Sequence, residues 1–379
     1  MAESLSPYWN GSERHEMKKK IGIVTIVDNT NYGNRLQNYA IYHLLRRKFR
    51  CSAVTLASCE EKAFYNGAYV AWIKNQIVKQ LCVFPSLAEK RFGNTVTRWA
   101  NFQKWSKLIP TKYYYSHKSL PRSLNEQYDL FVAGSDQIWN YHFSSHKFDD
   151  YFLKFADNQK RHAISASLGV DYLPEEWKDT FRNELSKFKN ISVREDAGQA
   201  IIQDLLGVDV PVLIDPTMML TKDEWLAVSR KPRVDCSKPY VLKYYLGDEA
   251  EEEKIDVWAK ENGYEVYELL NKDIPELYSA GPGEFISLIS NAALVCSDSF
   301  HCIVFSIIFS RPFLVYARQG SDNYMTSRLD TLLNKFGFED RWKHLVAPEN
   351  YLKCDYSAVP ERLEKEQQQF MDYLSIVLK

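Results

Sequence analysis

Residues 292–316 have the sequence AALVCSDSFHCIVFSIIFSRPFLVY. The apolar run at 292–296 predicts a buried strand, 303–310 predicts a short apolar helix, and 313–316 predicts a second strand. A strand, a polar turn, a helix and another strand form a βαβ unit, in which the two strands are parallel. The polar residues 297–301 then lie at the carboxyl end of a parallel strand, where open α/β sheets bind their ligands.

Strands and helices alternate in the same way through the rest of the chain, which predicts an α/β fold with two doubly wound, Rossmann-like domains. We expect an N-terminal domain at 18–172, a C-terminal domain at 173–350 and a helical extension at 351–379. A ligand is then expected in the cleft between them. The other predicted strands cover residues 21–27, 53–56, 128–133, 161–167, 191–193, 210–214, 240–245 and 264–270. The other predicted helices cover residues 36–45, two segments within 66–109, and 174–189, 195–206, 249–262, 327–336 and 360–378.

The composition is that of an ordinary globular protein. The 379 residues carry a formal net charge of -1, which gives no general attraction to nucleic acid. The seven cysteines form no CxxC pair and no zinc-ligand spacing, so we expect reduced thiols in a cytoplasmic protein. No apolar stretch reaches the roughly 18 residues of a membrane span, and the N-terminus lacks a secretion signal.

Four polar segments follow predicted strands, and each has a functional and a purely structural interpretation. Asp136 is either a general base or partner of a sugar hydroxyl, or the N-cap of a helix. Arg194 either binds a carboxylate or phosphate, or forms an exposed ion pair. His301 either transfers a proton near neutral pH, or is a hydrogen-bonded core histidine. The four segments are residues 29–37, 134–140, 194–196 and 297–301.

Several common signatures are missing from the sequence. It contains no GxGxxG after the first strand, no GxxxxGK[ST] and no GxSxG, which disfavours dinucleotide binding, P-loop chemistry and the usual hydrolase nucleophile. His142 and His146 are four residues apart, with Asp149 and Asp150 nearby, as metal ligands often are. Aromatic residues crowd this segment, so we favour structural or surface histidines and expect no metal.

At these polar segments the sequence resembles the polysaccharide pyruvyl transferase family. Each segment alone is a weak signal, but their order along the chain is fairly specific. The matching segments are IGIVT at 21–25 with NYGNRLQNYA at 31–40, DLFVAGSDQIWN at 129–140, ISVRE at 191–195 with VLIDPT at 212–217, and SDSFH at 297–301 with RPF at 311–313 and SRL at 327–329.

The resemblance implies two Rossmann-like domains in a GT-B-like arrangement, with a cleft between them. It also implies transfer of a pyruvyl group from phosphoenolpyruvate to hydroxyls of a polysaccharide or lipid-linked glycan precursor, forming a ketal. Phosphoenolpyruvate is then a co-substrate, and no other cofactor is expected. By similarity, His301 and Asp136 are the expected catalytic residues and Arg194 binds the donor. The expected acceptor-binding side chains come from the N-terminal domain and are Asn31, Asn34, Gln37 and Gln137.

One position departs from the family pattern. Better-understood pyruvyltransferases have a donor-binding arginine two residues before the histidine, and this sequence has Ser299 there. We therefore include Ser299 in the donor site and expect Arg318 or Arg328 to supply the charge. Two alternatives stay open: a GT-B-like glycosyltransferase that uses a nucleotide sugar, and a non-catalytic glycan-binding protein.

The segment 66–122 has ten Lys/Arg residues and one acidic residue. We favour a packed helical pair with a solvated basic face. The alternative is a site for an acidic or lipid-linked glycan at the inner membrane surface, to which Lys74, Lys79 and Arg98 would contribute.

Overall fold

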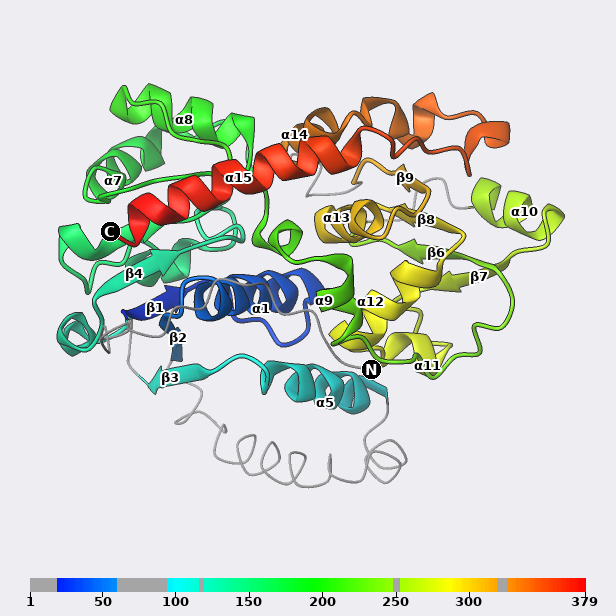
Figure 1. Ribbon diagram of the computed structural model, residues 1–379, viewed down its shortest axis with the longest axis horizontal. Coiled ribbons are helices and arrows are strands. Elements are labelled where there is room, and N and C mark those ends of the chain that lie inside the picture. Colours follow the sequence, from blue (N-terminus) through cyan, green and yellow to red (C-terminus); the bar gives the residue numbers. More distant parts are fainter. Residues whose placement is uncertain (1–18, 60–93, 116–118, 248–252, 319–325) are drawn as a thin grey trace, which may run out of the picture.

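The computed structural model describes residues 19–59, 94–115, 119–247, 253–318 and 326–379, and contains two parallel β-sheets side by side (Figure 1). The first sheet has the strand order β3-β2-β1-β4-β5 and the second has the order β7-β6-β8-β9. All neighbouring strands within each sheet are parallel. The strands are β1 Lys20–Val24, β2 Ser52–Cys59, β3 Thr111–Tyr115, β4 Leu130–Ala133, β5 Arg161–Ala163, β6 Tyr240–Tyr244, β7 Glu265–Glu268, β8 Leu294–Ser297 and β9 Phe313–Val315.

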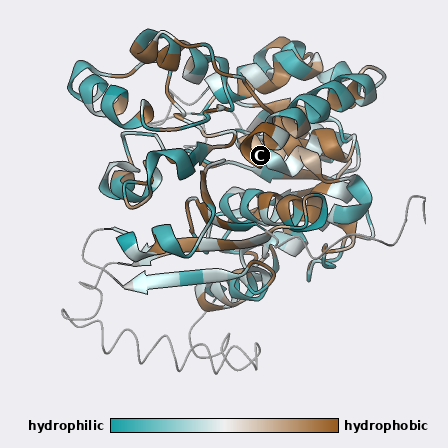
Figure 2. Cartoon of the chain, turned by 60° about the vertical axis from the view of Figure 1, so that its left-hand side comes forward, coloured by the Kyte–Doolittle hydropathy of each residue, from teal (hydrophilic) through white to brown (hydrophobic). Residues whose placement is uncertain are grey.

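Helices connect successive strands and shield the sheets from water. Central strands such as β4 and β8 are buried along their whole length, as expected for parallel strands with both faces covered. Figure 2 shows hydrophobic residues concentrated inside and hydrophilic residues on the outer faces of the helices. The α-helices are α1 Tyr32–Arg47, α5 Asn94–Ser106, α6 Phe148–Tyr151, α7 Glu175–Leu185, α8 Asp196–Leu206, α9 Lys222–Leu226, α10 Glu253–Glu261, α11 Pro275–Tyr278, α12 Pro282–Asn291, α13 Phe300–Ile308, α14 Ser327–Phe336 and α15 Val359–Val377.

The two sheets share one apolar core, because α1 of the first domain packs against α12 and α13 of the second. Tyr32, the first residue of α1, stacks on Phe285 of α12 with ring centroids 4.4 Å apart. Its hydroxyl donates to the carbonyl oxygen of Ala280 at 2.8 Å. These contacts fix the carboxyl ends of the two sets of strands relative to one another.

The last helix, α15, returns from the second domain to the first and crosses both in Figure 1. It packs on α14, and the hydroxyl of Tyr373 donates to the carbonyl oxygen of Ala163 in β5 at 2.7 Å. The predicted helix at 360–378 is therefore confirmed, and it ties the two domains together.

The structure confirms the predicted fold class, with two Rossmann-like domains of parallel strands. It also confirms the βαβ unit at 292–316, as β8, α13 and β9. The polar turn is shorter than predicted, since α13 begins at Phe300 and His301 lies in its first turn. Sequence analysis missed the strand β3 and the helix α12.

The predicted domain boundary at residue 172 does not coincide with the point where the chain passes from the first sheet to the second. Helices α7 and α8 pack with the core of the first sheet. The predicted strands at 191–193 and 210–214 are reduced to isolated parallel bridges, which join Ala166 to Val193 and Val193 to Val212. These bridges extend the first sheet beyond β5, so the chain passes to the second sheet between residue 215 and β6.

Most of the basic segment 66–122, including Lys74 and Lys79, lies outside the described residues. Its Arg98 is buried in α5, where it contacts Tyr32 and residues of the second domain. Arg98 is therefore not available to a membrane surface, and this part of the membrane hypothesis is wrong. In the described parts of the chain, no helix combines the length and apolar character needed to cross a membrane.

Candidate active site

A cavity of about 280 Å³ lies where the carboxyl ends of the strands of both domains meet. Asp136 follows β4, and His301 follows β8 in the opposite domain, so the cavity is a cleft between the two domains. Its wall includes most of the residues that the sequence predicts for the site. The lining residues are Ile26, Asp28, Asn31, Asn34, Asp136, Gln137, Phe143, Leu246, Ser299, Phe300, His301, Arg318 and Arg328.

Asp136 is buried and held by hydrogen bonds from two sides. Its Oδ1 accepts from the backbone N–H of Gln137 at 2.8 Å, and its Oδ2 accepts from the side-chain amide of Asn34. The Nη2 of Arg194 lies 3.8 Å from Oδ1. The predicted N-cap role is absent here, because 137–140 form no regular helix. The carboxylate instead faces the cavity in a fixed orientation.

Arg194 is fully buried and forms its strongest contact with Asp215. Its Nη1 donates to Oδ2 of Asp215 at 2.7 Å, which excludes the predicted alternative of an exposed ion pair. Its guanidinium carbon lies 4.4 Å from the centre of the Phe300 ring. Arg194 does not line the cavity itself, since Phe300 stands at the wall. Burial alone would lower the pKa of Arg194, but Asp215 and Asp136 outweigh it and raise that pKa.

His301 shares the carboxylate of Asp215 with Arg194. Its Nε2 lies 3.5 Å from Oδ2 of Asp215. Burial opposes the charged form of Asp215, but His301, Arg194 and the N–H of Thr217 together lower its pKa well below the ordinary value. Gly33 packs against the other side of the imidazole, where a Cβ atom would overlap the ring. The histidine is thus held between a carboxylate and the start of α1.

Arg328 and Arg318 add positive charge at the cavity wall. Arg328 is buried, and both of its terminal nitrogens lie 3.0 Å from the amide oxygen of Gln137 when this amide is oriented for hydrogen bonding. Burial, together with the nearby cations Arg194 and Arg318, lowers the pKa of Arg328 to about 9. The charged guanidinium is therefore poorly stabilised by its protein neighbours, and a bound anion would stabilise it. The Nε of Arg318 donates to Asp298 at 3.2 Å.

Ser299 also lines the cavity, as the residue before the first turn of α13. Its backbone N–H donates to the hydroxyl of Ser297 at 3.0 Å. The position that departs from the family pattern thus lies beside both arginines that we predicted as substitutes. The roles of all three in donor binding stay predictions.

Three of the four predicted acceptor residues reach the cavity, namely Asn31, Asn34 and Gln137. Gln37 does not. Its side chain is fully buried, and its amide oxygen accepts from the N–H and the hydroxyl of Ser135 at 3.2 and 3.0 Å. Its amide nitrogen donates to the hydroxyl of Thr25. The prediction for Gln37 is therefore wrong, because this side chain supports the segment before Asp136 instead of facing a ligand.

Sequence analysis assigned no role to Asp215, which joins Arg194 to His301. The available signal was that Asp215 directly follows the apolar run 210–214. Asp136 and His301 likewise follow predicted strands, and this drew attention to them. The spacing of His142 and His146 resembled that of metal ligands, but sequence analysis favoured structural or surface histidines there. Within the ranges that the structure describes, no three His, Cys, Asp or Glu side chains converge as metal ligands do.

A model of the polysaccharide pyruvyl transferase family matches residues 31–320 of the chain. The chain belongs to the polysaccharide pyruvyl transferase family. The match confirms the family that the sequence resembles. It includes Asp136, Arg194, His301 and Arg318, whereas Arg328 lies just beyond it.

Three solved structures illustrate the wider similarity. UDP-GlcNAc 2-epimerase from Methanocaldococcus jannaschii, in complex with UDP-GlcNAc and UDP, is 13% identical with a TM-score of 0.47, covering 89% of this chain and 94% of that one. A glycosyltransferase from Rickettsia africae is 10% identical with a TM-score of 0.44, covering 95% and 99%. The glycotransferase of kitacinnamycin is 12% identical with a TM-score of 0.41, covering 94% and 96%. No curated protein matches the chain. Because these TM-scores are low, the fold assignment for this pyruvyl transferase family member depends on its own two sheets.

Proposed function

We propose that the protein transfers the pyruvyl group of phosphoenolpyruvate to two hydroxyls of a sugar in a polysaccharide or lipid-linked glycan precursor. Membership of the polysaccharide pyruvyl transferase family supports the reaction class. The observation that carries the choice of donor is a concentration of buried and half-buried arginines at a cleft that also presents a histidine and a carboxylate. Arg318 and Arg328 line the cleft, and Arg194 lies directly behind Phe300.

Phosphoenolpyruvate carries a carboxylate and a phosphate, and guanidinium groups bind both kinds of anion. Arg328 is the better substitute for the arginine that Ser299 replaces. Both terminal nitrogens of Arg328 lie 3.0 Å from the neutral amide oxygen of Gln137, whereas the Nε of Arg318 pairs with the carboxylate of Asp298. An anionic donor would relieve the repulsion between Arg328 and its cationic neighbours.

The reaction requires two proton movements. The methylene carbon of phosphoenolpyruvate gains a proton, one sugar hydroxyl adds to the adjacent carbon, phosphate leaves, and a second hydroxyl closes the ketal. The two hydroxyls lose two protons, of which one goes to the methylene carbon and one leaves with phosphate. His301, whose Nε2 lies 3.5 Å from the carboxylate of Asp215, is suited to donate the proton to carbon. Asp136, held as a carboxylate acceptor by Asn34 and Gln137, is suited to accept a hydroxyl proton.

The test is to incubate the protein with phosphoenolpyruvate and a panel of lipid-linked sugars, and to measure phosphate release with and without each acceptor. We expect phosphate release that depends on an acceptor. His301→Ala should abolish turnover while phosphoenolpyruvate still binds. Arg328→Gln should instead weaken phosphoenolpyruvate binding by about tenfold or more, as expected for the loss of a charged hydrogen-bonding partner.

The exposed His344 offers a matched control, since it does not line the cavity and His344→Ala should leave turnover unchanged. Near-normal activity of His301→Ala would contradict the role of that histidine. Binding of nucleotide sugars without binding of phosphoenolpyruvate would contradict the donor and favour a glycosyltransferase. Sugar binding without any turnover would favour a glycan-binding protein.

A further inference from the structure

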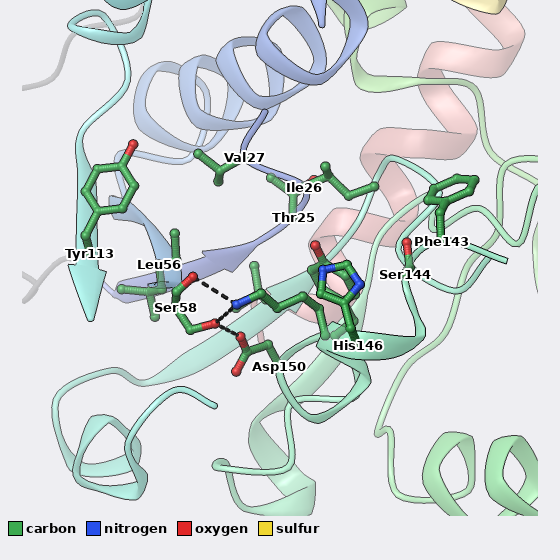
Figure 3. A pocket seen from close by; sticks show the side chains of 14 residues that line it. Thr25, Ile26, Val27, Leu56, Ser58, Tyr113, Phe143, Ser144, His146 and Asp150 are labelled. Carbon is green, nitrogen blue, oxygen red and sulfur yellow. Dashed lines mark hydrogen bonds between the residues drawn. The ribbon is translucent and has the colours of Figure 1, made fainter. Parts of the chain in front are cut away.

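A second cavity, of about 250 Å³, opens in the N-terminal domain (Figure 3). We propose that it is the acceptor subsite and binds a neutral hexopyranose residue of the glycan. This inference rests on the proposed function, because that function makes a bound sugar the acceptor. The cavity and its ability to bind a sugar do not depend on the identity of the donor. The lining residues are Val24, Thr25, Ile26, Val27, Leu56, Ala57, Ser58, Tyr113, Phe143, Ser144, His146, Lys147, Asp150 and Tyr151.

The position of the second cavity suits an acceptor. It lies at the carboxyl ends of β1 and β2, on the same side of the sheet as Asp136, which follows β4. Ile26 and Phe143 line both cavities, so the two cavities meet at these residues. A sugar ring in the second cavity would therefore have its hydroxyls at the border of the proposed donor site.

The polar side of the cavity is a connected and rigid network. Lys147 donates to the carbonyl oxygen of Ser58 at 3.1 Å and to its hydroxyl at 2.7 Å. The hydroxyl of Ser58 donates in turn to Asp150, which also accepts from the N–H of Leu120 at 2.6 Å. An ammonium group has three N–H donors, and these contacts use two of them. Among the residues that the structure describes, these are the acceptors of Lys147, so its third N–H can donate to a ligand oxygen.

Charge balance within this network favours a neutral ligand. Asp150 is buried, and burial raises the pKa of its carboxyl against the opposing effect of its hydrogen bonds from Ser58 and Leu120. Lys147 provides the nearby positive charge. A neutral, hydroxyl-rich molecule can bond to these groups without adding an unpaired charge, whereas a phosphate or carboxylate would face Asp150.

Aromatic side chains form the open sides of the same cavity. Tyr113 on β3 and Phe143 are 45% and 40% exposed, although both are large and apolar. In Figure 3 the labelled Tyr113 and Phe143 stand on opposite sides of the polar groups, with His146 between Phe143 and Ser58. Partly exposed aromatic faces beside a few convergent polar groups are typical of small-molecule sites, and a pyranose ring offers both C–H and hydroxyl surfaces.

The test measures sugar binding in the absence of any donor. Saturation-transfer NMR and titration calorimetry would use methyl pyranosides of glucose, galactose, mannose and N-acetylglucosamine as probes. We expect at least one probe to bind the intact protein at millimolar or lower concentration. Tyr113→Ala should weaken that binding by about fivefold or more, while binding of phosphoenolpyruvate stays unchanged.

Tyr172→Ala is the matched control, because Tyr172 is 66% exposed and lines neither cavity. Lys147→Met tests the polar side and should also weaken sugar binding. If no probe binds, or if a probe binds equally well to Tyr113→Ala and Lys147→Met, the acceptor subsite is wrong. If sugars bind as expected but phosphoenolpyruvate does not, the proposed function fails and the sugar subsite stands.

Discussion

Asp215 connects Arg194 of the first domain to His301 of the second domain. It is completely buried, and its two oxygens are shared among Arg194, His301 and the backbone and hydroxyl of Thr217. The carboxylate therefore compensates the buried guanidinium and fixes the imidazole at the same time. Asp215 does not line the cavity, so we regard it as a positioning residue.

Asp215→Asn should reduce turnover by about 100-fold, because the amide cannot stabilise a positive charge on His301. The binding constant for phosphoenolpyruvate should change much less, and steady-state kinetics separates the two effects. Breaking the buried pair with Arg194 should also lower the free energy of unfolding by about 3 kcal/mol at neutral pH. Asp273→Asn, at an exposed carboxylate, is the control and should alter neither property.

The pH dependence of stability gives an independent check on the same residue. The pKa of Asp215 is lower in the folded protein than the ~3.9 of an unfolded aspartate. Its interactions therefore stabilise the folded state above about pH 4, and this stabilisation is lost as the pH falls further. The difference in stability between the wild type and Asp215→Asn should narrow below pH 4. A difference that is constant with pH would contradict the charged role of Asp215.

At the scale of single elements, apolar runs predicted the central strands well, since β1, β4, β6 and β8 are buried on both faces. The strand β3, Thr111–Tyr115, was missed because it lies at the edge of its sheet and contains no apolar run. The helix α12 consists largely of apolar residues, so its helical periodicity is hard to distinguish from the apolar run of β8 that follows it.

The chain leaves the first sheet later than the predicted domain boundary, and sequence patterns do not show this for a related physical reason. Sequence periodicity identifies a helix such as α7 but does not show which sheet it covers. The contacts of Phe181 and Leu185 with the first core decide that question, and they are made with residues distant in the sequence. The same limit applies to the site. The positions of the strand ends predicted Asp136, Arg194 and His301. Only tertiary contacts show that Asp215 joins Arg194 to His301 and that Gln37 does not reach the cavity.

One prediction at this scale concerns the helix α15. Tyr373→Phe removes the hydrogen bond to the carbonyl oxygen of Ala163 but keeps the packing of the ring. That carbonyl also accepts from the N–H and hydroxyl of Ser192, so it is not left without a partner. We therefore expect a loss of only about 1 kcal/mol in the free energy of unfolding, measured by urea denaturation. A loss above 3 kcal/mol, or none beyond that of the exposed control Tyr172→Phe, would contradict this role.

At the scale of the whole molecule, the apolar core continues from α1 into the second domain, so the two domains are expected to unfold together. The cleft exists because this shared core fixes one sheet against the other. The family match and the site predictions both extend across this junction, since Asp136 and His301 come from different domains. Catalysis as proposed here therefore depends on contacts that fix the two domains relative to each other.

Arg98 makes several polar contacts of this kind. Its guanidinium donates to Tyr32 at 2.7 Å, to the carbonyl oxygen of Thr30 at 2.9 Å and to that of Tyr278 at 3.1 Å. It also lies 4.7 Å from the Tyr32 ring and 4.8 Å from the Phe102 ring. Arg98 thus connects α5, the start of α1 and the second domain, and it does so while buried.

Arg98→Met should keep much of the packing of the side chain but remove the donor from one buried and two partly buried acceptors. We expect a loss of about 3 kcal/mol in the free energy of unfolding, with a single transition retained because Tyr32 still stacks on Phe285. Turnover should fall together with stability, whereas binding to anionic liposomes should be the same as for the wild type at temperatures where both are folded. Differential scanning calorimetry and vesicle sedimentation measure the two properties. Two separate unfolding transitions in the wild type would refute the shared core. If Arg98→Met lost liposome binding while it stayed folded, Arg98 would act at the membrane surface, which its burial argues against.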